Sequence, residues 1–174
     1  MTLKTGAPFR GLRILARGAF VLLATLGLAA CSRSDAAYED FNNIDLRGAE
    51  LTIARPLASA EPILTLSVKI ADTIPSRQKG LMGVRALPPE SGMVFPFETP
   101  VGIGFYMKNT LIPLDIAFWG PGRRIIAILQ MAPCKDDPCP LHSPGQTYVG
   151  ALEVNRGVLA KNGVRVGDLV ELAP

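Results

Sequence analysis

Short apolar runs broken by glycine and proline are the feature that most constrains how this chain folds. In the range 63–70, Leu64, Leu66, Val68 and Ile70 alternate with polar residues, which is the pattern of a half-buried β-strand. Similar runs follow, with turns drawn from 17 glycines and 15 prolines between them. The pattern predicts a mainly β fold (α+β with minor helix): a compact single-domain β-sandwich or partly closed barrel with roughly six to eight short strands and one or two short helices.

The same periodicity places the other elements. Further strands are expected at 92–97, 103–107, 114–119, 124–131 and 147–154. The range 164–172 finishes the domain and is broken by a turn at Gly167-Asp168. The run 124–131 is almost continuously apolar, which is typical of a strand that is covered on both faces. A helical turn or two is expected over 75–82, with Ser76 as its cap and Gly83 at its end, and a second short helix over 158–162.

The first thirty residues predict export. They include Lys4, Arg10, Arg13 and Arg17 but no acid, and then an uncharged stretch, 18–30, that is shorter than the roughly 20 residues a membrane-spanning helix needs. Such a stretch is typical of a secretory signal. The sequence Leu-Ala-Ala-Cys at 28–31 resembles the bacterial lipoprotein box. We therefore expect a lipoprotein signal peptide over 1–30 and a lipid on Cys31 that anchors the protein to a membrane, facing the periplasm. A buried N-terminal helix and plain secretion are the alternatives.

Removing this leader changes the charge balance. The whole chain has a net charge of +3, but the four leader bases leave 14 basic and 15 acidic residues in 31–174, a net of −1. Nucleic acid would find little to bind there, so no nucleic-acid partner is expected. Residues 31–62 are expected to be a tether or N-terminal extension, with a weak strand pattern over 50–54, and residues 63–174 the folded domain.

The cysteines agree with an exported protein. A lipid on Cys31 leaves only Cys134 and Cys139, and two thiols so close in sequence are expected to form a disulfide outside the cytoplasm. The loop they close is short, so the chain-entropy model gives this bond only about 2 kcal/mol.

Polar and charged residues suggest a candidate site. Lys108, Asn109 and Asp115 are close in sequence, and Arg77 and Glu153 are their nearest candidate partners. In one interpretation these five residues form a pocket, in which a base meets an anionic or hydroxyl-rich ligand and the two acids accept hydrogen bonds. In the other they form a structural network that orders loops. A third possibility is an enzyme in which Asp115 and Glu153 divide the acid and base roles.

Soft ligands suggest copper as a further alternative. The candidates are Met82, Met93, Met107, Met131, Cys134, Cys139 and His142. Each methionine lies in an apolar run, however, where methionine commonly fills a core. We therefore expect no metal site and no cofactor, and the short motifs of nucleotide-binding loops, serine hydrolases and zinc proteases are missing from the sequence.

Five blocks in order carry a family resemblance. They are residues 77–82, 92–95, 106–116, 133–140 and 152–157. Together they resemble the bacterial and archaeal family called domain of unknown function 192, over about residues 64–172. Tyr106 stands where the family commonly has tryptophan, and Gly83-Val84 replaces a bulkier residue. The resemblance implies a compact, mostly β domain that is often exported, without an established activity. The sequence as a whole favours a lipid-anchored, non-catalytic module that binds a small ligand or an envelope protein.

Overall fold

The computed structural model describes residues 39–56 and 61–173. These residues belong to one compact unit. The predicted signal peptide, 1–30, and Cys31, the predicted lipidation site, lie outside the described residues. No helix within the described part has the length and apolar character that crossing a membrane requires.

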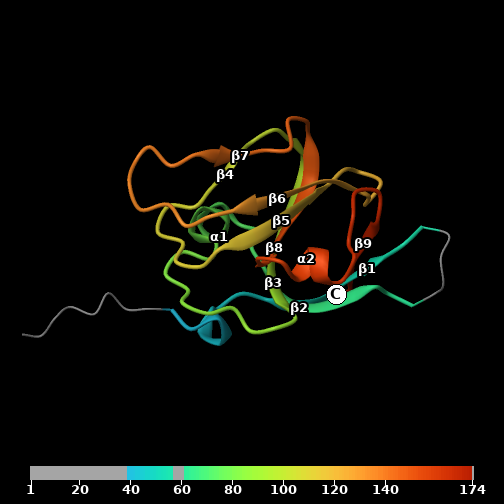
Figure 1. Cartoon of the computed structure of the whole chain (residues 1–174), viewed down its shortest axis with the longest axis horizontal. Helices are drawn as coiled ribbons and strands as arrows, with labels where there is room; N and C mark the ends of the chain where they lie inside the picture. Colours follow the sequence, from blue (N-terminus) through green and yellow to red (C-terminus); the bar gives the residue numbers. More distant parts are fainter. Residues whose placement is uncertain (1–38, 57–60, 174) are drawn as a thin grey trace, which may run out of the picture. The chain divides into compact units, whose positions relative to one another are not determined.

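The described residues form nine strands, two α-helices and one 3-10 helix (Figure 1). The strands are β1 (Gly48–Ala54), β2 (Leu64–Ile70), β3 (Ser91–Val101), β4 (Phe105–Tyr106), β5 (Leu114–Trp119), β6 (Ile125–Met131), β7 (Leu141–His142), β8 (Tyr148–Asn155) and β9 (Leu169–Ala173). The helices are the 3-10 helix η1 (Phe41–Asn43), α1 (Ile74–Lys79) and α2 (Val158–Lys161). The predicted mainly β fold with minor helix is confirmed.

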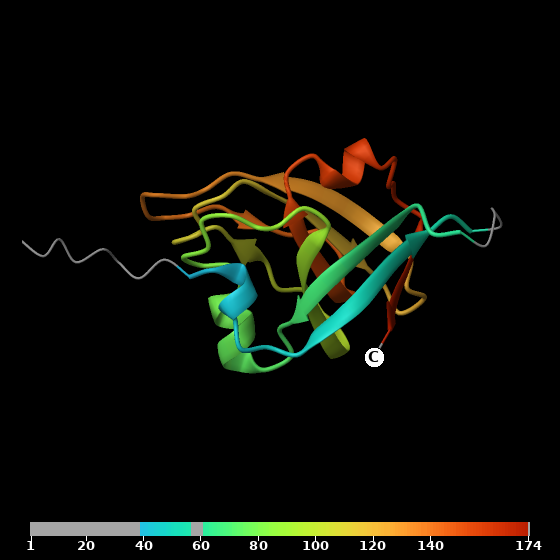
Figure 2. The same ribbon diagram turned by 90° about the horizontal axis from the view of Figure 1, so that it is seen from below.

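Seven strands form one sheet that curls into a half-barrel (Figures 1 and 2). Its order is β6-β5-β8-β3-β2-β1-β9, and every neighbouring pair is antiparallel except β2 and β3. The two edge strands meet at one corner, where Arg124 bridges Leu169 and the Val170 N–H donates to the Arg123 carbonyl. Of the two predicted architectures, the partly closed barrel is therefore the correct one. The strand number exceeds the predicted range because of β7, a two-residue strand that was not predicted and that pairs with β4 in a separate ribbon.

Side chains alternate between two hydrophobic cores because successive residues of a strand point to opposite faces. In β8, Ala151 packs into the first core and Leu152 and Val154 into the second. The first core also contains residues of η1, β3 and β5, and the second contains residues of β1, β2 and α2. All six residues of β5 are buried, since this strand is paired on both sides and covered on both faces.

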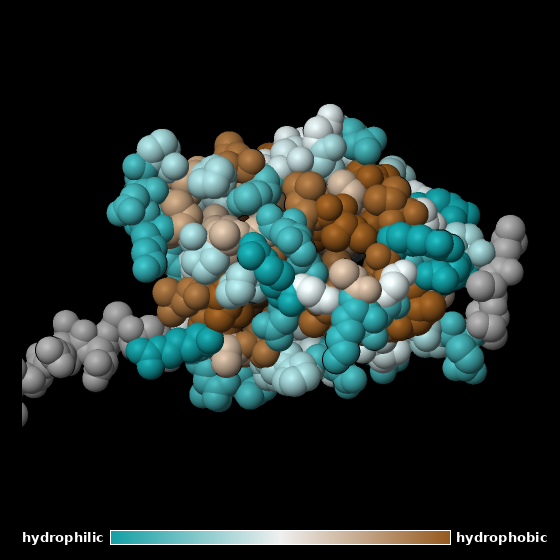
Figure 3. Space-filling model, in the orientation of Figure 1, coloured by the Kyte–Doolittle hydropathy of each residue, from teal (hydrophilic) through white to brown (hydrophobic). Residues whose placement is uncertain are grey.

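The prediction that 124–131 is covered on both faces is wrong. β6 is an edge strand, and Ile126, Ala127, Ile128 and Leu129 are only partly buried. Figure 3 shows hydrophobic side chains at the surface in the middle of the side of the molecule seen in Figure 1, where β5 and β6 run. A continuous apolar run does not show whether a strand lies in the centre of a sheet or at its edge. That position depends on how the strand pairs with segments distant in sequence.

Helix α1 begins and ends earlier than predicted. Thr73 is its N-cap, and its hydroxyl accepts a hydrogen bond from the Ser76 N–H, while the Ser76 hydroxyl accepts one from the Thr73 N–H. Ser76 is thus the third residue of a capping box rather than the cap itself. The helix ends at Gly80, whose φ of 47° suits glycine. This short, capped helix carries Arg77 and Lys79 to the site described below.

The sheet starts before residue 63. Within the predicted tether, the weak strand at 50–54 is real and forms most of β1, which pairs with both β2 and β9. Phe41 and Ile44 are buried in the first core, and Figure 2 shows η1 beside α1. Residues 39–56 are therefore part of the folded domain, because the edge of β2 needs a partner strand.

Candidate functional site

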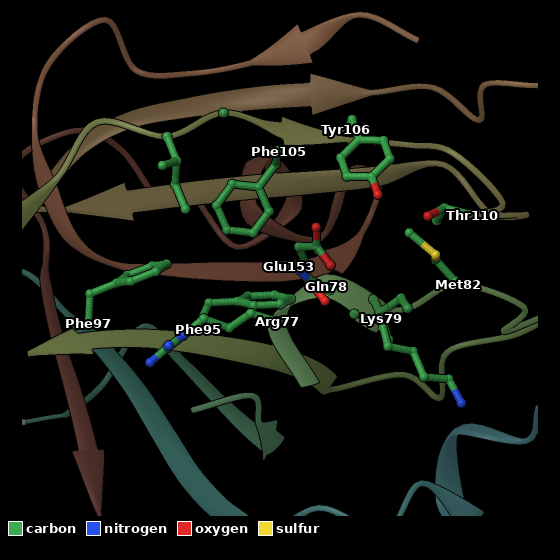
Figure 4. A pocket seen from close by; sticks show the side chains of 14 residues that line it. Arg77, Gln78, Lys79, Met82, Phe95, Phe97, Phe105, Tyr106, Thr110 and Glu153 are labelled. Atoms are coloured by element: carbon green, nitrogen blue, oxygen red, sulfur yellow. The ribbon is translucent and has the colours of Figure 1, made fainter. Parts of the chain in front are cut away.

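A cavity of about 180 Å³ opens between α1, the middle of β3, the β4 strand and β8. Its lining is Arg77, Gln78, Lys79, Gly80, Leu81, Met82, Phe95, Phe97, Ile103, Gly104, Phe105, Tyr106, Thr110 and Glu153 (Figure 4). The apolar part of this lining is larger than the polar part. Concave, mostly apolar sites with a few polar groups are the usual form of small-molecule sites.

Aromatic rings pack edge to face along one side of the cavity. Phe105 lies 5.0 Å from Phe95 and 5.7 Å from Phe118, measured between ring centroids. Tyr148 lies 4.9 Å from Phe118, and its hydroxyl donates a 2.9 Å hydrogen bond to the Ile103 carbonyl. That bond ties the segment before β4 to the sheet. Burial raises the pKa of Tyr148 to about 12, so its hydroxyl stays a donor at physiological pH.

Glu153 is the acid of this cavity. Its side chain points from β8 into the space below Phe105 and Tyr106 in Figure 4, yet the residue is only 6% exposed. Its carboxyl makes no hydrogen bond or salt bridge with any described residue. Burial raises its pKa to about 8. A buried carboxyl without a partner is costly when ionised, so the empty cavity favours the protonated acid.

The two basic residues of the lining have partners of their own. Arg77 Nη2 donates to the Pro96 carbonyl at 2.7 Å, and its guanidinium lies over the Phe97 ring, 4.8 Å from the centroid. Its Nε is buried without a hydrogen-bond partner. Lys79 forms a salt bridge with Glu39. Neither cation forms a salt bridge with Glu153.

Asp115, which the sequence placed in the same site as Glu153, faces the other side of the sheet. Glu153 pairs with Ile116 across β5 and β8, so the neighbouring Asp115 points to the opposite face. Its Oδ2 accepts a 2.8 Å hydrogen bond from the Gly157 N–H, at the start of α2. Burial raises the Asp115 pKa, and the N–H groups of Gly157 and Leu159 and the charge of Arg156 act against that rise. Asp115 and Glu153 therefore do not face one cleft, which the acid–base enzyme hypothesis requires.

Lys108 and Asn109, also predicted to bind the ligand, do not line the cavity. Lys108 forms a salt bridge with Asp137 in the loop after β6, and this hydrogen-bonded carboxylate raises the Lys108 pKa. Asn109 has a φ of 57°, and its carbonyl accepts from the Gly83 N–H. Both residues order loops, as the structural interpretation expected. Their neighbour Thr110 does line the cavity.

The sulfur-containing residues proposed as copper ligands have other roles in the structure. Cys134 and Cys139 are joined by a disulfide, which confirms that prediction and leaves neither sulfur as a thiolate ligand. Met93, Met107 and Met131 are buried in the first core, and Met82 lines the cavity. Residues 39–56 and 61–173 contain no group of three or more His, Cys, Asp or Glu residues placed to hold a metal ion.

Two of the predicted site residues, Arg77 and Glu153, line the cavity, but sequence reasoning missed its aromatic walls. The aromatic residues of the cavity lie in runs that the pattern predicted as strands: Phe95, Phe97, Phe105 and Tyr106. A strand pattern indicates that side chains are buried, but it does not show which residues they contact. β4 reaches the cavity because it pairs with β7, 36 residues further along the chain, through Phe105–His142 and Tyr106–Leu141. The usable signal was the density of aromatic residues in two neighbouring runs.

Comparisons with known proteins agree with this fold. Among solved structures, a protein of unknown function from Novosphingobium aromaticivorans DSM 12444 is 30% identical, with a TM-score of 0.67 over 79% of this chain and 94% of that chain. A protein from Sinorhizobium meliloti 1021, described as a candidate transcription regulator, is 26% identical, with a TM-score of 0.65 over 73% and 95%. No curated protein matches the chain. The family model of DUF192, described as uncharacterized ACR, matches residues 57–172. The chain thus belongs to the domain of unknown function 192 family.

Proposed function

We propose that this domain is a non-catalytic binding module that holds a small molecule in the cavity beside α1. The observation that carries the proposal is the pairing of an aromatic-walled cavity with one buried, unpartnered carboxyl, that of Glu153. A polar group in such a place usually serves orientation and specificity, whereas the apolar walls supply most of the affinity.

The size of the cavity limits the ligand. An engineered cavity of about 150 Å³ in another protein binds benzene, and this one, about 180 Å³, is also open on one side. A ligand of one ring with a short polar arm fits these dimensions. A longer molecule would extend past Ile103 and Tyr106, which are 54% and 44% exposed at the edge of the cavity.

The lining favours binding over catalysis. Glu153 is its one carboxyl, and Asp115, the expected second acid, faces away. Glycoside hydrolysis in its usual form needs two carboxyls on one cleft. The cavity lining also contains no histidine and no cysteine. What remains is a mostly apolar cavity with one carboxyl.

Binding can be tested with 2-phenylethanol, a neutral probe of the expected size, by ligand-observed NMR and thermal shift. We expect saturable binding to the wild-type chain and its loss in Met82→Trp, whose ring would fill the cavity. Val166→Trp is the matched control, because Val166 is 60% exposed and lies outside the lining. Equal binding by both variants, or none by the wild type, would contradict the proposal.

We also propose that the module works in the cell envelope, anchored through a lipid on Cys31. The support is the leader sequence, with its basic start, its uncharged stretch and the Leu-Ala-Ala-Cys box. Fractionation of cells that express the full chain tests it: the wild type should sediment with membranes and Cys31→Ser should not. A soluble wild-type protein would contradict the anchor.

The description of the Sinorhizobium meliloti structure as a candidate regulator does not alter this proposal. Residues 31–174 carry 14 basic and 15 acidic residues, a balance that gives phosphate groups little attraction. A gel-shift assay with random duplex DNA at low salt should show no complex.

A further inference from the structure

We infer that the cavity selects a small organic cation, an amine attached to an apolar ring, with its ammonium group against Glu153. The inference rests on the proposed binding function and names the chemical class of the ligand. It follows from three features of the site: the free acid, the aromatic rings that line the cavity with it, and the engagement of both neighbouring cations elsewhere.

The Glu153 carboxyl is the polar group of the lining that most needs a partner. It is 94% buried, projects into the cavity, and has no protein group to neutralise it. An ammonium group supplies both an opposite charge and N–H donors, so it satisfies the carboxylate in a place that water reaches poorly. A hydroxyl supplies the donor but not the charge.

The aromatic walls favour the same ligand. Phe95, Phe105 and Tyr106 lie around the carboxyl in Figure 4, and all three line the cavity. Ring faces attract cations, and the attraction grows when the cation is shielded from water. The same rings pack against the apolar part of the ligand. Acid and rings together resemble the general design by which proteins hold ammonium groups.

The other charged groups of the lining do not compete for Glu153. Arg77 is bonded to the Pro96 carbonyl and stacked on Phe97, and Lys79 is paired with Glu39. The remaining titratable group that faces the cavity is the Tyr106 phenol. A cationic ligand therefore meets one unneutralised acid, whereas an anionic ligand meets that acid and two cations that already have partners.

Binding should also be linked to a proton. Burial raises the pKa of Glu153 to about 8, so the acid is largely protonated at neutral pH when the cavity is empty. When the ammonium enters, the carboxyl O–H bond breaks, its proton passes to the buffer, and a carboxylate–ammonium pair forms. The affinity for an amine should therefore rise with pH from 6 to 8, while the affinity for a neutral probe should not.

Isothermal titration of three matched probes tests the inference: 2-phenylethylamine, 2-phenylethanol and phenylacetate. At pH 8 we expect the amine to bind the full chain at least about tenfold more tightly than the alcohol, and phenylacetate to bind most weakly. In Glu153→Gln the ratio of amine affinity to alcohol affinity should fall to about one, whatever the change in the affinity for the alcohol. Circular dichroism and thermal unfolding check that the variant is folded.

A second measurement needs no variant. Titration of the wild type with the amine at neutral pH, in buffers of different ionisation enthalpy, should show the release of most of one proton per ligand. Equal affinity for all three probes, or tighter binding of the alcohol or phenylacetate, would overturn the cation inference and leave the binding module intact. Failure of all three probes to bind would contradict the proposed function itself.

Discussion

Asp115 and Glu153 are buried on neighbouring strands of one sheet and point to opposite faces of it. The register pairs Asp115 with Val154 and Ile116 with Glu153. Each acid therefore meets a different environment. Asp115 has a backbone donor at the start of α2, whereas Glu153 has none and faces the cavity. Asp115 therefore contributes to the stability of the fold, whereas Glu153 is available to a ligand.

Replacing Asp115 should affect stability and leave binding unchanged. Asp115→Ala leaves the Gly157 N–H without its 2.8 Å acceptor and should lower the free energy of unfolding by about 1–3 kcal/mol. Asp115→Asn keeps an acceptor oxygen and should cost less. Urea unfolding measures the loss, and 2-phenylethanol should bind Asp115→Asn as it binds the wild type. Asp45→Ala, at an exposed acid, is the matched control. Weaker probe binding in Asp115→Asn would place this acid in the site after all.

Replacing Glu153 should remove a pH dependence of stability. The pKa of Glu153 is about 8 in the folded state against an ordinary value of 4.5. Between these values the folded chain holds a proton that the unfolded chain has released, so raising the pH destabilises the fold. The full effect is on the order of 5 kcal/mol, since the shift is about 3.5 pKa units and each unit is about 1.4 kcal/mol. Wild type should therefore lose stability relative to Glu153→Gln as the pH rises from 5 to 8.

Urea unfolding of both proteins at several pH values measures this difference. Glu171→Gln, at an exposed position of β9, controls for loss of a negative charge and should run parallel to the wild type. Parallel curves for Glu153→Gln and the wild type would show that the folded-state pKa of Glu153 is ordinary.

Local periodicity predicted which segments are strands but not how they pair. The alternation at 64–70 sufficed for β2, because one face of that strand is buried and the other is less so. It could not show that β6 lies at an edge, or that β1, in the predicted tether, extends the sheet between β2 and β9. Those facts depend on contacts between segments far apart in sequence, which no local pattern contains.

The same limit applies to the site. Asp115 was grouped with Lys108 and Asn109 because the three residues are close in sequence, and Arg77 and Glu153 were added as charged partners. A shift of one residue in the pairing of β5 with β8 exchanges the two faces, so only the register could separate Asp115 from Glu153. Lys108 was excluded from the cavity by its salt bridge with Asp137, a partner in a loop that sequence patterns do not place.

Gly150 should not accept a side chain. It lies opposite Trp119 across β5 and β8, and a Cβ at this position would lie 2.1 Å from Trp119 Cζ2. Both residues belong to a paired strand, so the backbone cannot move away, and Gly150→Ala should cost about 3 kcal/mol of stability. Trp119 is the single tryptophan of the chain, so its fluorescence during urea unfolding measures the loss of stability in Gly150→Ala.

Two further variants separate this clash from a general effect of removing glycine. At Gly120 a Cβ would lie 3.8 Å from Ile126 Cγ2, an ordinary contact, so Gly120→Ala should change stability little. In a Trp119→Leu background, followed by circular dichroism, Gly150→Ala should cost much less than in the wild type. The same cost in both backgrounds would mean that Trp119 is not the cause.

Loss of the Cys134–Cys139 disulfide should be tolerated. The bond joins residues separated by 5 positions in the loop between β6 and β7, so it restricts the unfolded chain little, and Cys134→Ser with Cys139→Ser should lower stability by about 2 kcal/mol. The Cys134 N–H donates to the Met107 carbonyl in either case, which keeps the start of this loop in place. A reductant should bring the wild type to the stability of the double variant and leave that variant unchanged. Unfolding of the double variant in buffer alone would show that the fold of the whole domain depends on this disulfide.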